Sequence, residues 1–139
     1  MKSEDFNKLP NFTELEVGRT GANFGDVEFN TMLCLQMVRS ELGLVIRLIK
    51  NGLTTGKHQS KTHHDGKAVD FHFDIYVSPI KVIVAMIQSG FKGIGVYKNA
   101  KGFYSYHGDT RAEFGCWYRE YSEDETYIEE SLFNSRLFL

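Results

Sequence analysis

The stretch Gly93-Ile-Gly-Val-Tyr-Lys-Asn-Ala-Lys-Gly-Phe-Tyr-Ser-Tyr-His107 contains two short runs of apolar and aromatic residues on either side of a polar Asn-Ala-Lys-Gly segment. Short runs of this composition are typical of β-strands, and Asn and Gly between them favour a tight turn. The stretch therefore predicts a β-hairpin with strands at Gly93–Tyr97 and Gly102–His107. In this hairpin, His107 lies at the end of the second strand.

Two helices are predicted upstream of the hairpin. From Val27 onward, apolar residues recur mostly at steps of three and four residues, as in an amphipathic helix, until Gly43 ends the pattern. Pro79 is well placed in the first turn of a second helix, whose apolar stripe continues until Ser89 and Gly90 stop it. We expect both helices to bury their apolar faces.

Two further strands are predicted between these helices. Leu44–Ile49 is short, apolar and β-branched, and an Asn-Gly pair soon breaks it. Ala68–Phe73 is predicted to be a strand in which alternate residues point to opposite faces. Asp70 and His72 are therefore expected to share one face. We interpret His72, like His58, as a structural or surface residue rather than a metal ligand.

A polar loop and the strand after it contain a short-spaced pair of possible metal ligands, His63 and Asp70, and His107 is a distant third candidate. Zinc in hydrolases binds three His, Asp or Glu ligands and leaves a fourth position for a water whose pKa falls to about 7. Gly66 permits a tight turn that can bring the first two ligands onto one metal. His64 replaces His63 as a ligand if the loop register shifts, although the spacings to Gly66 and Asp70 favour His63.

The composition is that of a globular protein with little net charge. The chain has 139 residues, of which 42% are hydrophobic and 14% aromatic, with 18 acidic and 16 basic side chains. Nothing in this balance points to nucleic acid or to a membrane, and no apolar run approaches the roughly 20 residues of a membrane span. The sequence leaves the oligomeric state open.

We expect a single domain over residues 1–139, because a chain of this length can bury a core without disulfides. Residues 1–25 are predicted to form an irregular N-terminal arm with room for one short helix. Residues 118–139 are predicted to form a C-terminal extension, whose apolar end folds back on the core as a helix. Cys34 and Cys116 are interpreted as reduced core residues. The polar N-terminus lacks the apolar segment of a secretory signal, so we expect a protein that is cytoplasmic as synthesised.

Four motifs carry a resemblance to a known family. They are His63-x-x-Gly66-x-Ala68-x-Asp70, Gly93-x-Gly95-x-Tyr97, Gly102-Phe103-x-x-x-His107-x-Asp109-x-Arg111, and Trp117 beyond them. Together they resemble the zinc D-Ala-D-Ala carboxypeptidase family of peptidoglycan peptidases. This family includes the vancomycin-resistance dipeptidases, phage endolysins that cut cell-wall peptides and, by fold, the hedgehog signalling domain. The likeness runs from about Val27 to about Trp117, and it is to the branch whose last ligand lies in a His-x-Asp-x-Arg motif.

The resemblance implies an α+β fold with a central, mostly antiparallel sheet flanked by helices, similar to the hedgehog and D,D-peptidase folds. It also implies a zinc ion held by His63, Asp70 and His107, which polarises the scissile carbonyl and supplies the attacking hydroxide. The expected activity is hydrolysis of peptidoglycan stem peptides, as a D,D- or L,D-carboxypeptidase or endopeptidase, for example a phage endolysin that lysis releases to the cell wall. The sequence leaves open which bond is cut and whether the protein is of phage or cellular origin.

The resemblance does not fix the general base. Many relatives have a Glu three residues before the last His, where this chain has Tyr104. Asp109 lies two residues after His107, on the same side of an extended strand, and is our candidate for the catalytic base. Asp109 can equally orient the imidazole of His107. Arg111 is a candidate for binding a substrate carboxylate, or else it pairs with Asp109 or Glu113.

Two positions before the first ligand depart from the family pattern. Relatives commonly have an Arg that stabilises the developing oxyanion, where this chain has Leu53-Thr-Thr-Gly-Lys57, and Lys57 is the candidate substitute. The Ser that relatives place two residues before the first ligand falls on Lys61, and the neighbouring Ser60 is the candidate there. These departures favour a second hypothesis, a zinc-holding domain without peptidase activity that has a structural or binding role, for example in a phage particle. A third hypothesis is that the fold holds no metal.

Overall fold

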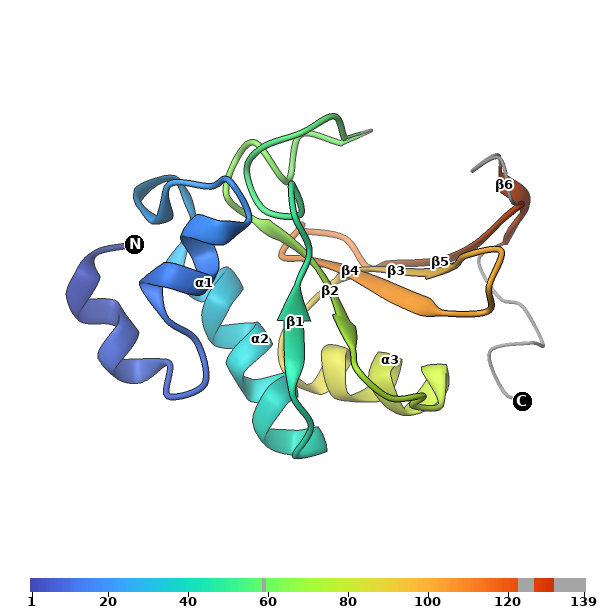
Figure 1. Ribbon diagram of the computed structural model, residues 1–139, viewed down its shortest axis with the longest axis horizontal. Coiled ribbons are helices and arrows are strands. Elements are labelled where there is room, and N and C mark those ends of the chain that lie inside the picture. Colours follow the sequence, from blue (N-terminus) through green and yellow to red (C-terminus); the bar gives the residue numbers. More distant parts are fainter. Residues whose placement is uncertain (59, 123–126, 132–139) are drawn as a thin grey trace.

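The computed structural model describes residues 1–58, 60–122 and 127–131, and it has an α+β fold (Figure 1). The helical segments are η1 (Ser3–Lys8), α1 (Glu14–Arg19), η2 (Phe24–Asp26), α2 (Phe29–Leu42) and α3 (Pro79–Gln88), of which the two η segments are 3-10 helices. The strands are β1 (Ile46–Leu48), β2 (Ala68–Phe73), β3 (Gly93–Lys98), β4 (Tyr104–Asp109), β5 (Gly115–Tyr121) and β6 (Tyr127–Ser131).

The described strands form one sheet in the order β1-β2-β4-β3-β5-β6. The neighbouring pairs among them are antiparallel except for β3 and β5, which run parallel. The expected α+β class and the expected mostly antiparallel sheet are therefore confirmed. The sheet order does not follow the chain order, because β4 lies between β2 and β3.

The predicted β-hairpin is formed by β3 and β4. Its turn is closed by hydrogen bonds from the backbone N–H of Asn99 to the carbonyl of Phe103 (2.9 Å) and from the N–H of Gly102 to the carbonyl of Asn99 (3.0 Å). Gly102 has a φ of +86°, a left-handed conformation that costs glycine little. The local turn chemistry therefore fixes the register of this hairpin, which is the centre of the sheet.

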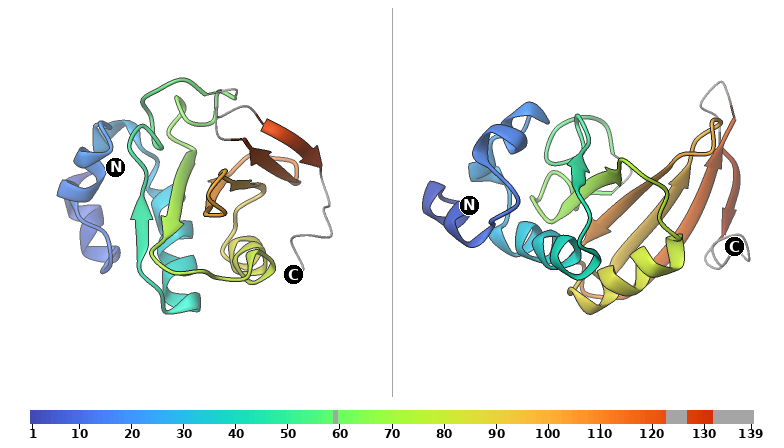
Figure 2. Two further views of the ribbon diagram at one scale, coloured as in Figure 1. Left: turned by 45° about the vertical axis from the view of Figure 1, so that its right-hand side comes forward. Right: turned by 60° about the horizontal axis from the view of Figure 1, so that its bottom comes forward.

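The helices α2 and α3 cover one face of the sheet, and the long loop after β1 lies at the opposite face (Figures 1 and 2). Five helix-facing side chains of β2, β3 and β4 are buried, namely Val69, Phe71, Ile94, Val96 and Tyr106. Gly108 of β4 shares this face, and a Cβ added there would lie 2.9 Å from both Met86 and Phe91. Because alternate residues of a strand point to opposite faces, Asp70 and His107 point away from the helices.

Both predicted helices are present and end where expected, although α2 begins at Phe29, two residues after Val27. Helix α2 ends at Leu42, because Gly43 adopts a φ of +65° and donates its N–H to the carbonyl of Arg39 at 3.0 Å. Helix α3 begins with Pro79 in its first turn, where the missing N–H needs no partner. Among the described residues, no helix is long and apolar enough to cross a membrane.

The N-terminal arm is more regular than predicted. It contains α1 and both 3-10 segments, and Leu9, Phe12 and Val17 are buried in the common core. A capping box starts α1, because the Thr13 hydroxyl accepts from the N–H of Glu16 (3.2 Å) and the Glu16 carboxylate accepts from the N–H of Thr13 (2.9 Å). The arm is therefore an integral part of the domain rather than an irregular appendage.

The prediction of a C-terminal extension that begins at residue 118 is not matched by the structure. Strand β5 starts at Gly115 and continues through Tyr121, so residues 118–121 belong to the sheet. Strand β6 then pairs antiparallel with β5. The helix predicted for the apolar end of the chain falls on residues 132–139, which lie outside the described residues.

Both cysteines are free and buried, as expected for reduced core residues. Burial raises the pKa of the Cys34 thiol, although a backbone hydrogen bond partly opposes this, and burial also raises the pKa of Cys116. The reactive thiolate form of each side chain is therefore disfavoured.

Candidate metal centre and groove

A row of residues crosses four strands on the face that points away from the helices. Asp70 of β2 lies opposite His107 of β4, His107 lies opposite Gly95 of β3, and Gly95 is paired with Trp117 of β5. The antiparallel pairing of β2 and β4 thus brings an Asp and a His from distant parts of the sequence to one position on the sheet.

The backbone of Asp70 is held on both sides. Its N–H donates to the carbonyl of Gly52 at 2.7 Å, and its carbonyl accepts from the N–H of Ile49 at 3.2 Å. A Cβ on Gly52 would lie 2.9 Å from the Cβ of Asp70, so a larger residue cannot fit beside this carboxylate without movement. The chain after β1 therefore fixes the position of Asp70 from the edge of the sheet.

His63 reaches the same place from a turn that depends on Gly66. Gly66 has a φ of +74° and donates its N–H to the carbonyl of His63 at 3.0 Å. A Cβ on Gly66 would collide with the carbonyl of Asp26, and the Gly66 carbonyl accepts from the hydroxyl of Thr31 at 2.9 Å. The predicted tight turn is present, and it is anchored to the start of α2.

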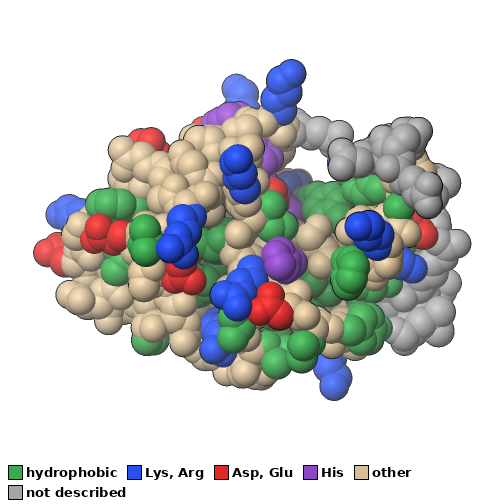
Figure 3. Space-filling view, in the orientation of Figure 1, with side chains coloured by type: hydrophobic (Ala, Val, Ile, Leu, Met, Phe, Trp, Pro, Cys, Tyr) green, Lys and Arg blue, Asp and Glu red, His purple; other side chains and the backbone are tan. Residues whose placement is uncertain are grey.

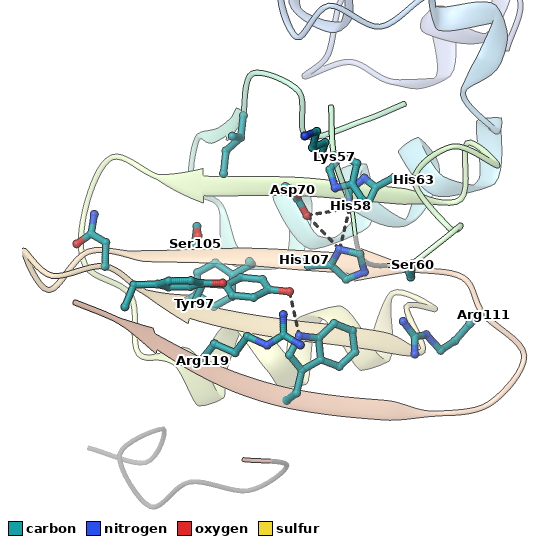
Figure 4. Close-up of a pocket in the computed structure, with 15 residues that line it drawn as sticks. Lys57, His58, Ser60, His63, Asp70, Tyr97, Ser105, His107, Arg111 and Arg119 are labelled. Carbon is teal, nitrogen blue, oxygen red and sulfur yellow. Dashed lines mark hydrogen bonds and ion pairs between the residues drawn. The ribbon is translucent and has the colours of Figure 1, made fainter. Parts of the chain in front are cut away.

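The side chains of His63, Asp70 and His107 converge on one point (Figure 4). His63 Nε2 lies 3.1 Å from His107 Nδ1 and 3.3 Å from Asp70 Oδ1, and His107 Nδ1 lies 3.0 Å from Asp70 Oδ1. Two ligands of a tetrahedral zinc ion lie about 3.3 Å apart when each is about 2.0–2.1 Å from the metal. The three predicted ligands therefore have the mutual spacing that a single metal ion requires.

The outer nitrogen of each imidazole has its own acceptor. His63 Nδ1 is 2.8 Å from the carbonyl oxygen of Leu53, and His107 Nε2 is 2.7 Å from Oδ2 of Asp109. Both outer nitrogens are therefore N–H donors, which leaves His63 Nε2 and His107 Nδ1 with lone pairs in the neutral rings. Metal-binding imidazoles are usually oriented in this way. No sequence pattern identifies the Leu53 carbonyl as an acceptor, because it is a backbone group.

The charges around this point favour a cation. Burial raises the pKa of Asp70, but hydrogen bonds with His107 and His63, which form when a ring carries a second proton, outweigh burial and lower it. Burial likewise lowers the pKa of His107, but hydrogen bonds to Asp109 and Asp70 outweigh burial and raise it. The cluster thus stabilises an added positive charge, which either a proton on His107 or a metal ion can supply.

His58 is a third imidazole beside the centre, which the sequence analysis did not assign to it. Its ring stacks on that of His63 with 3.6 Å between centroids and 15° between planes. Ligand atoms of His58, His63 and Asp70 all lie within 4.8 Å of one another, close enough to hold a metal ion. His58 Nε2 is 2.9 Å from the carbonyl oxygen of Asn51 and 2.8 Å from that of Thr55. Since this nitrogen donates to the backbone, only Nδ1 of His58 has a lone pair that can accept a hydrogen bond or bind a cation.

The other two histidines lie apart from these converging atoms. His64 is exposed, and its Nδ1 is 3.1 Å from the carbonyl oxygen of Thr54, so the loop register presents His63 as the spacing argument predicted. His72 has its Nδ1 3.2 Å from the carbonyl oxygen of Phe73. The ligand atoms of His63, Asp70 and His107 lie 3.0–3.3 Å from one another, and His64 and His72 instead contact backbone carbonyls.

Asp109, the predicted catalytic base, has no exposed surface. Its Oδ2 accepts from His107 Nε2 and from Arg111 Nη2 (2.6 Å), and its Oδ1 accepts from Arg111 Nε (2.8 Å). Burial raises the pKa of Asp109, but the hydrogen bonds from Arg111 and His107 outweigh burial and hold it well below its usual range. This geometry favours the alternative considered for Asp109, in which it orients His107. Arg111 correspondingly makes the structural pair with Asp109, and its guanidinium also lies 5.0 Å from the centre of the Trp117 ring.

A groove of about 720 Å³ opens over the converging ligand atoms. The three residues predicted to bind substrate all line it, and they are Lys57, Ser60 and Arg111. Figure 3 shows the surface hollowed to the right of its centre, where histidine and hydrophobic side chains line the recess. Among the described residues that line the groove, Asp70 is the one carboxylate. The remaining charged lining is basic.

One wall of the groove is aromatic. The indole of Trp117 leans over Gly95, and its ring centre lies 5.3 Å from that of His107 although a strand separates the two. Trp117 Nε1 donates to the hydroxyl oxygen of Tyr97 at 2.9 Å. A Cβ on Gly95 would lie 2.7 Å from both of these atoms. The glycine of the Gly-x-Gly-x-Tyr motif therefore makes room for the aromatic wall.

A second groove of about 530 Å³ adjoins the first, and both are lined by Asn99, Ser105 and Tyr106. Three large hydrophobic side chains in or beside it are strongly exposed, namely Ile75, Tyr76 and Phe103. The two grooves together give room for a ligand longer than two residues.

Comparison of this chain with protein-family models, with curated proteins and with solved structures finds no significant match.

Proposed function

We propose that this protein is a zinc metallopeptidase that hydrolyses peptide bonds in peptidoglycan stem peptides. The observation that carries the proposal is the convergence of His63 Nε2, Asp70 Oδ1 and His107 Nδ1 at separations of 3.0–3.3 Å, with the outer nitrogen of each ring held by another acceptor. Three neutral or anionic donors this close repel one another unless a cation lies between them. Two imidazoles and one carboxylate are a ligand set of catalytic zinc sites.

The motifs that carry the family resemblance support the choice of substrate. The His-x-x-Gly-x-Ala-x-Asp motif supplies two of the three ligands and the turn at Gly66, and the His-x-Asp-x-Arg motif supplies the third ligand and the Asp109 pair. The Gly-x-Gly-x-Tyr motif makes space for the aromatic wall. Motifs that are far apart in the sequence thus have roles at one site. We extend the proposal to a hedgehog-like or D,D-peptidase-like fold on the same grounds.

In the proposed reaction, a bound zinc ion would polarise the scissile carbonyl and lower the pKa of a water molecule. The residues that would hold the zinc ion are themselves held in place by other groups of the protein. His63 is fixed by the Leu53 carbonyl, and His107 by the buried Asp109. The aromatic wall and the two connected grooves bind the peptide and exclude water from one side of the site.

A second candidate function is a zinc-holding domain without peptidase activity. It is favoured by the groove lining, where Asp70 is the one carboxylate among the described residues and is already a proposed ligand. Tyr104, at the position of the Glu that relatives have, packs against the core from the other face of the sheet. In this alternative, metal binding stabilises the fold and no proton acceptor is needed.

Mass spectrometry distinguishes the two candidates. Purified stem peptides are incubated with the zinc-loaded protein and with a sample treated with a chelator. We expect new fragments in the zinc-loaded sample that are absent from the chelated one, and their masses identify the bond that is cut. Intact peptides across several wall types, from a protein with one bound zinc ion per chain, would instead favour the inactive domain.

A further inference from the structure

The hydroxyl of Tyr97 lies in the row of residues that includes two of the proposed metal ligands. Tyr97 itself is one step along β3 from this row, because its partner on β4 is Ser105 rather than His107. Its side chain leans back over the row, since a Cβ added to Gly95 would lie 2.7 Å from Tyr97 Oη. Gly95 is the partner of His107, and directly opposite residues of an antiparallel pair have Cα atoms about 4.5–5.5 Å apart. The hydroxyl is therefore about one strand spacing from the start of the His107 side chain.

Trp117 orients this hydroxyl. Its Nε1 donates to Tyr97 Oη at 2.9 Å, from the β5 side of β3, and Figure 4 marks this bond. A phenol has one O–H and accepts through its lone pairs, so the proton of Tyr97 points away from the indole. Among the described residues, the bond from Trp117 is the one hydrogen bond of this hydroxyl. Tyr97 lines the groove, so its O–H can donate to a ligand bound there.

The environment of Tyr97 keeps the hydroxyl protonated. Burial raises its pKa to about 12, although the hydrogen bond from Trp117 opposes this shift. The charge of Asp70 raises the pKa further, so the phenol lies within electrostatic range of a proposed ligand. At neutral pH the group is therefore a neutral donor, and it does not compete with the proposed ligands for a metal ion.

Three other groups that line the groove are less suited to donate at the metal centre. The ammonium group of Lys57 belongs to an exposed side chain. Arg111 donates from Nε and Nη2 to the carboxylate of Asp109. His58 Nε2 donates to two backbone carbonyls. Compared with these groups, Tyr97 combines a fixed position in the row with a proton that has no acceptor among the described residues.

We propose that Tyr97 is a further catalytic residue, whose hydroxyl donates a hydrogen bond to the oxyanion that develops on the scissile carbonyl, an inference that rests on the proposed peptidase function. When hydroxide adds to that carbonyl, a new C–O bond forms and the π electron pair moves onto the carbonyl oxygen. Tyr97 keeps its proton and stabilises the new charge. A donor that is already oriented is effective because it need not reorganise as the charge develops. Tyr97 thus supplies the contact for which Lys57 was the candidate.

Binding of a small oxyanion tests the hydroxyl apart from peptide hydrolysis. The full chain is loaded with cobalt(II), which accepts the same ligand types as zinc and has a visible spectrum that changes when a ligand binds the metal. Inorganic phosphate, a tetrahedral oxyanion, and imidazole, which is mostly neutral at about pH 8, are titrated separately. We expect Tyr97→Phe to weaken phosphate binding at least about tenfold and imidazole binding less than about threefold, because only phosphate loses a hydrogen bond to a charged oxygen.

Tyr118→Phe is the matched control for this titration. It removes a hydroxyl that donates to Glu120 on the other face of the sheet, so both affinities should stay unchanged. Equal phosphate affinity in the wild type and Tyr97→Phe, including no measurable binding by either, overturns the inference. Equal losses of phosphate and imidazole binding in Tyr97→Phe also overturn it, because a purely structural role would disturb the metal centre for both probes.

Hydrolysis of stem peptides by the zinc-loaded protein separates this inference from the proposed function. We expect Tyr97→Phe to lower kcat about 100-fold and to change KM less than about threefold, because the oxyanion is absent from the bound substrate. If phosphate binding depends on Tyr97 but no peptide is cut, the oxyanion contact stands and the peptidase proposal fails. If peptides are cut and Tyr97→Phe keeps the wild-type kcat, the peptidase proposal stands and the catalytic role of Tyr97 fails.

Discussion

At the scale of single residues, Asp109 is the side chain whose role the structure changes most. It is fully buried and its oxygens are occupied by His107 and Arg111. Asp109→Asn keeps the shape but removes the charge that stabilises the His107 ring, so we expect zinc affinity to fall about 10–100-fold. Competition with a chromophoric chelator measures this change. Asp65→Asn, at an exposed position in the loop that carries His63, is the control and should leave zinc affinity unchanged. An unchanged affinity in the Asp109 variant would refute the orienting role.

Tyr97 predicts a pH dependence of stability. Burial raises its pKa to about 12, whereas a tyrosine in an unfolded chain ionises near pH 10. Between these values the folded protein keeps a proton that the unfolded chain has lost, so the stability due to this group is full below about pH 10 and is lost as pH rises toward about 12. We expect the free energy of unfolding in urea to fall more steeply over this range in the wild type than in Tyr97→Phe. Parallel curves for the two proteins would show that Tyr97 is not buried as described.

At the scale of elements, the turn that carries His63 depends on Gly66. Gly66→Ala must overcome both a left-handed φ and a collision with the carbonyl of Asp26. We expect a loss of about 2–4 kcal/mol in the free energy of unfolding, together with weaker zinc binding, because the turn positions a ligand. Gly102→Ala is the matched control, since Gly102 has a similar φ but nothing within 4 Å of an added Cβ. If urea unfolding gives equal losses for both variants, the collision with Asp26 is not important.

The elements that could be predicted from the sequence are those with local signals. Gly43 and Pro79 mark helix ends by their own backbone chemistry, and the Asn99–Gly102 turn is readable without knowledge of the rest. Strand β5 was missed because it pairs in parallel with β3. Parallel strands are not joined by a tight turn, so the pairing has no local sequence signal. The N-terminal arm was read as irregular because its helices are short and depend on packing of residues such as Val17 in the core.

The candidate ligands could be predicted from the sequence, whereas the groups that hold them in place could not. The spacing around Gly66 identifies His63 and Asp70, and the register of β2 against β4 explains why His107 lies opposite Asp70. The role of Asp109 was left open because sequence spacing does not show whether a carboxylate is buried or which groups bond to its oxygens. The positions of Leu53 and His58 depend on how a polar loop folds, and loop conformation cannot be predicted from hydrophobic periodicity.

At the scale of the whole molecule, the three proposed ligands join a loop to two strands of the sheet, so metal binding should stabilise the entire domain. A ligand that binds only the folded state adds about 2.7 kcal/mol when its concentration is 100 times its Kd. We expect the thermal unfolding midpoint to rise with added zinc and to fall on treatment with a chelator. The double variant His63→Ala, His107→Ala should lose both the shift and the bound zinc, while His64→Ala should keep them. Stoichiometric zinc in the double variant would mean that the metal centre lies elsewhere.

One face of the sheet packs against the core, and the other face carries the candidate site. Helices α2 and α3 bury the apolar side chains of one face, and this packing holds the strands in register. The opposite face carries the row of Asp70, His107, Gly95 and Trp117 and the groove beside it, where small residues such as Gly93 and Gly95 give room to larger polar and aromatic neighbours. Stability and chemistry are thus separated by the alternation of side chains along each strand.

Strand β5 pairs with β3 but follows the β3–β4 hairpin in the chain, so it is synthesised after β2, β3 and β4. Every proposed ligand precedes residue 110, whereas Trp117 and Arg119 belong to the strand added afterwards. As the chain leaves the ribosome, the loop, β2 and the hairpin can meet and capture metal before the aromatic wall exists. Substitutions on the groove-facing side of β5 can therefore change what the groove recognises while the proposed metal ligands, which are synthesised earlier, keep their positions.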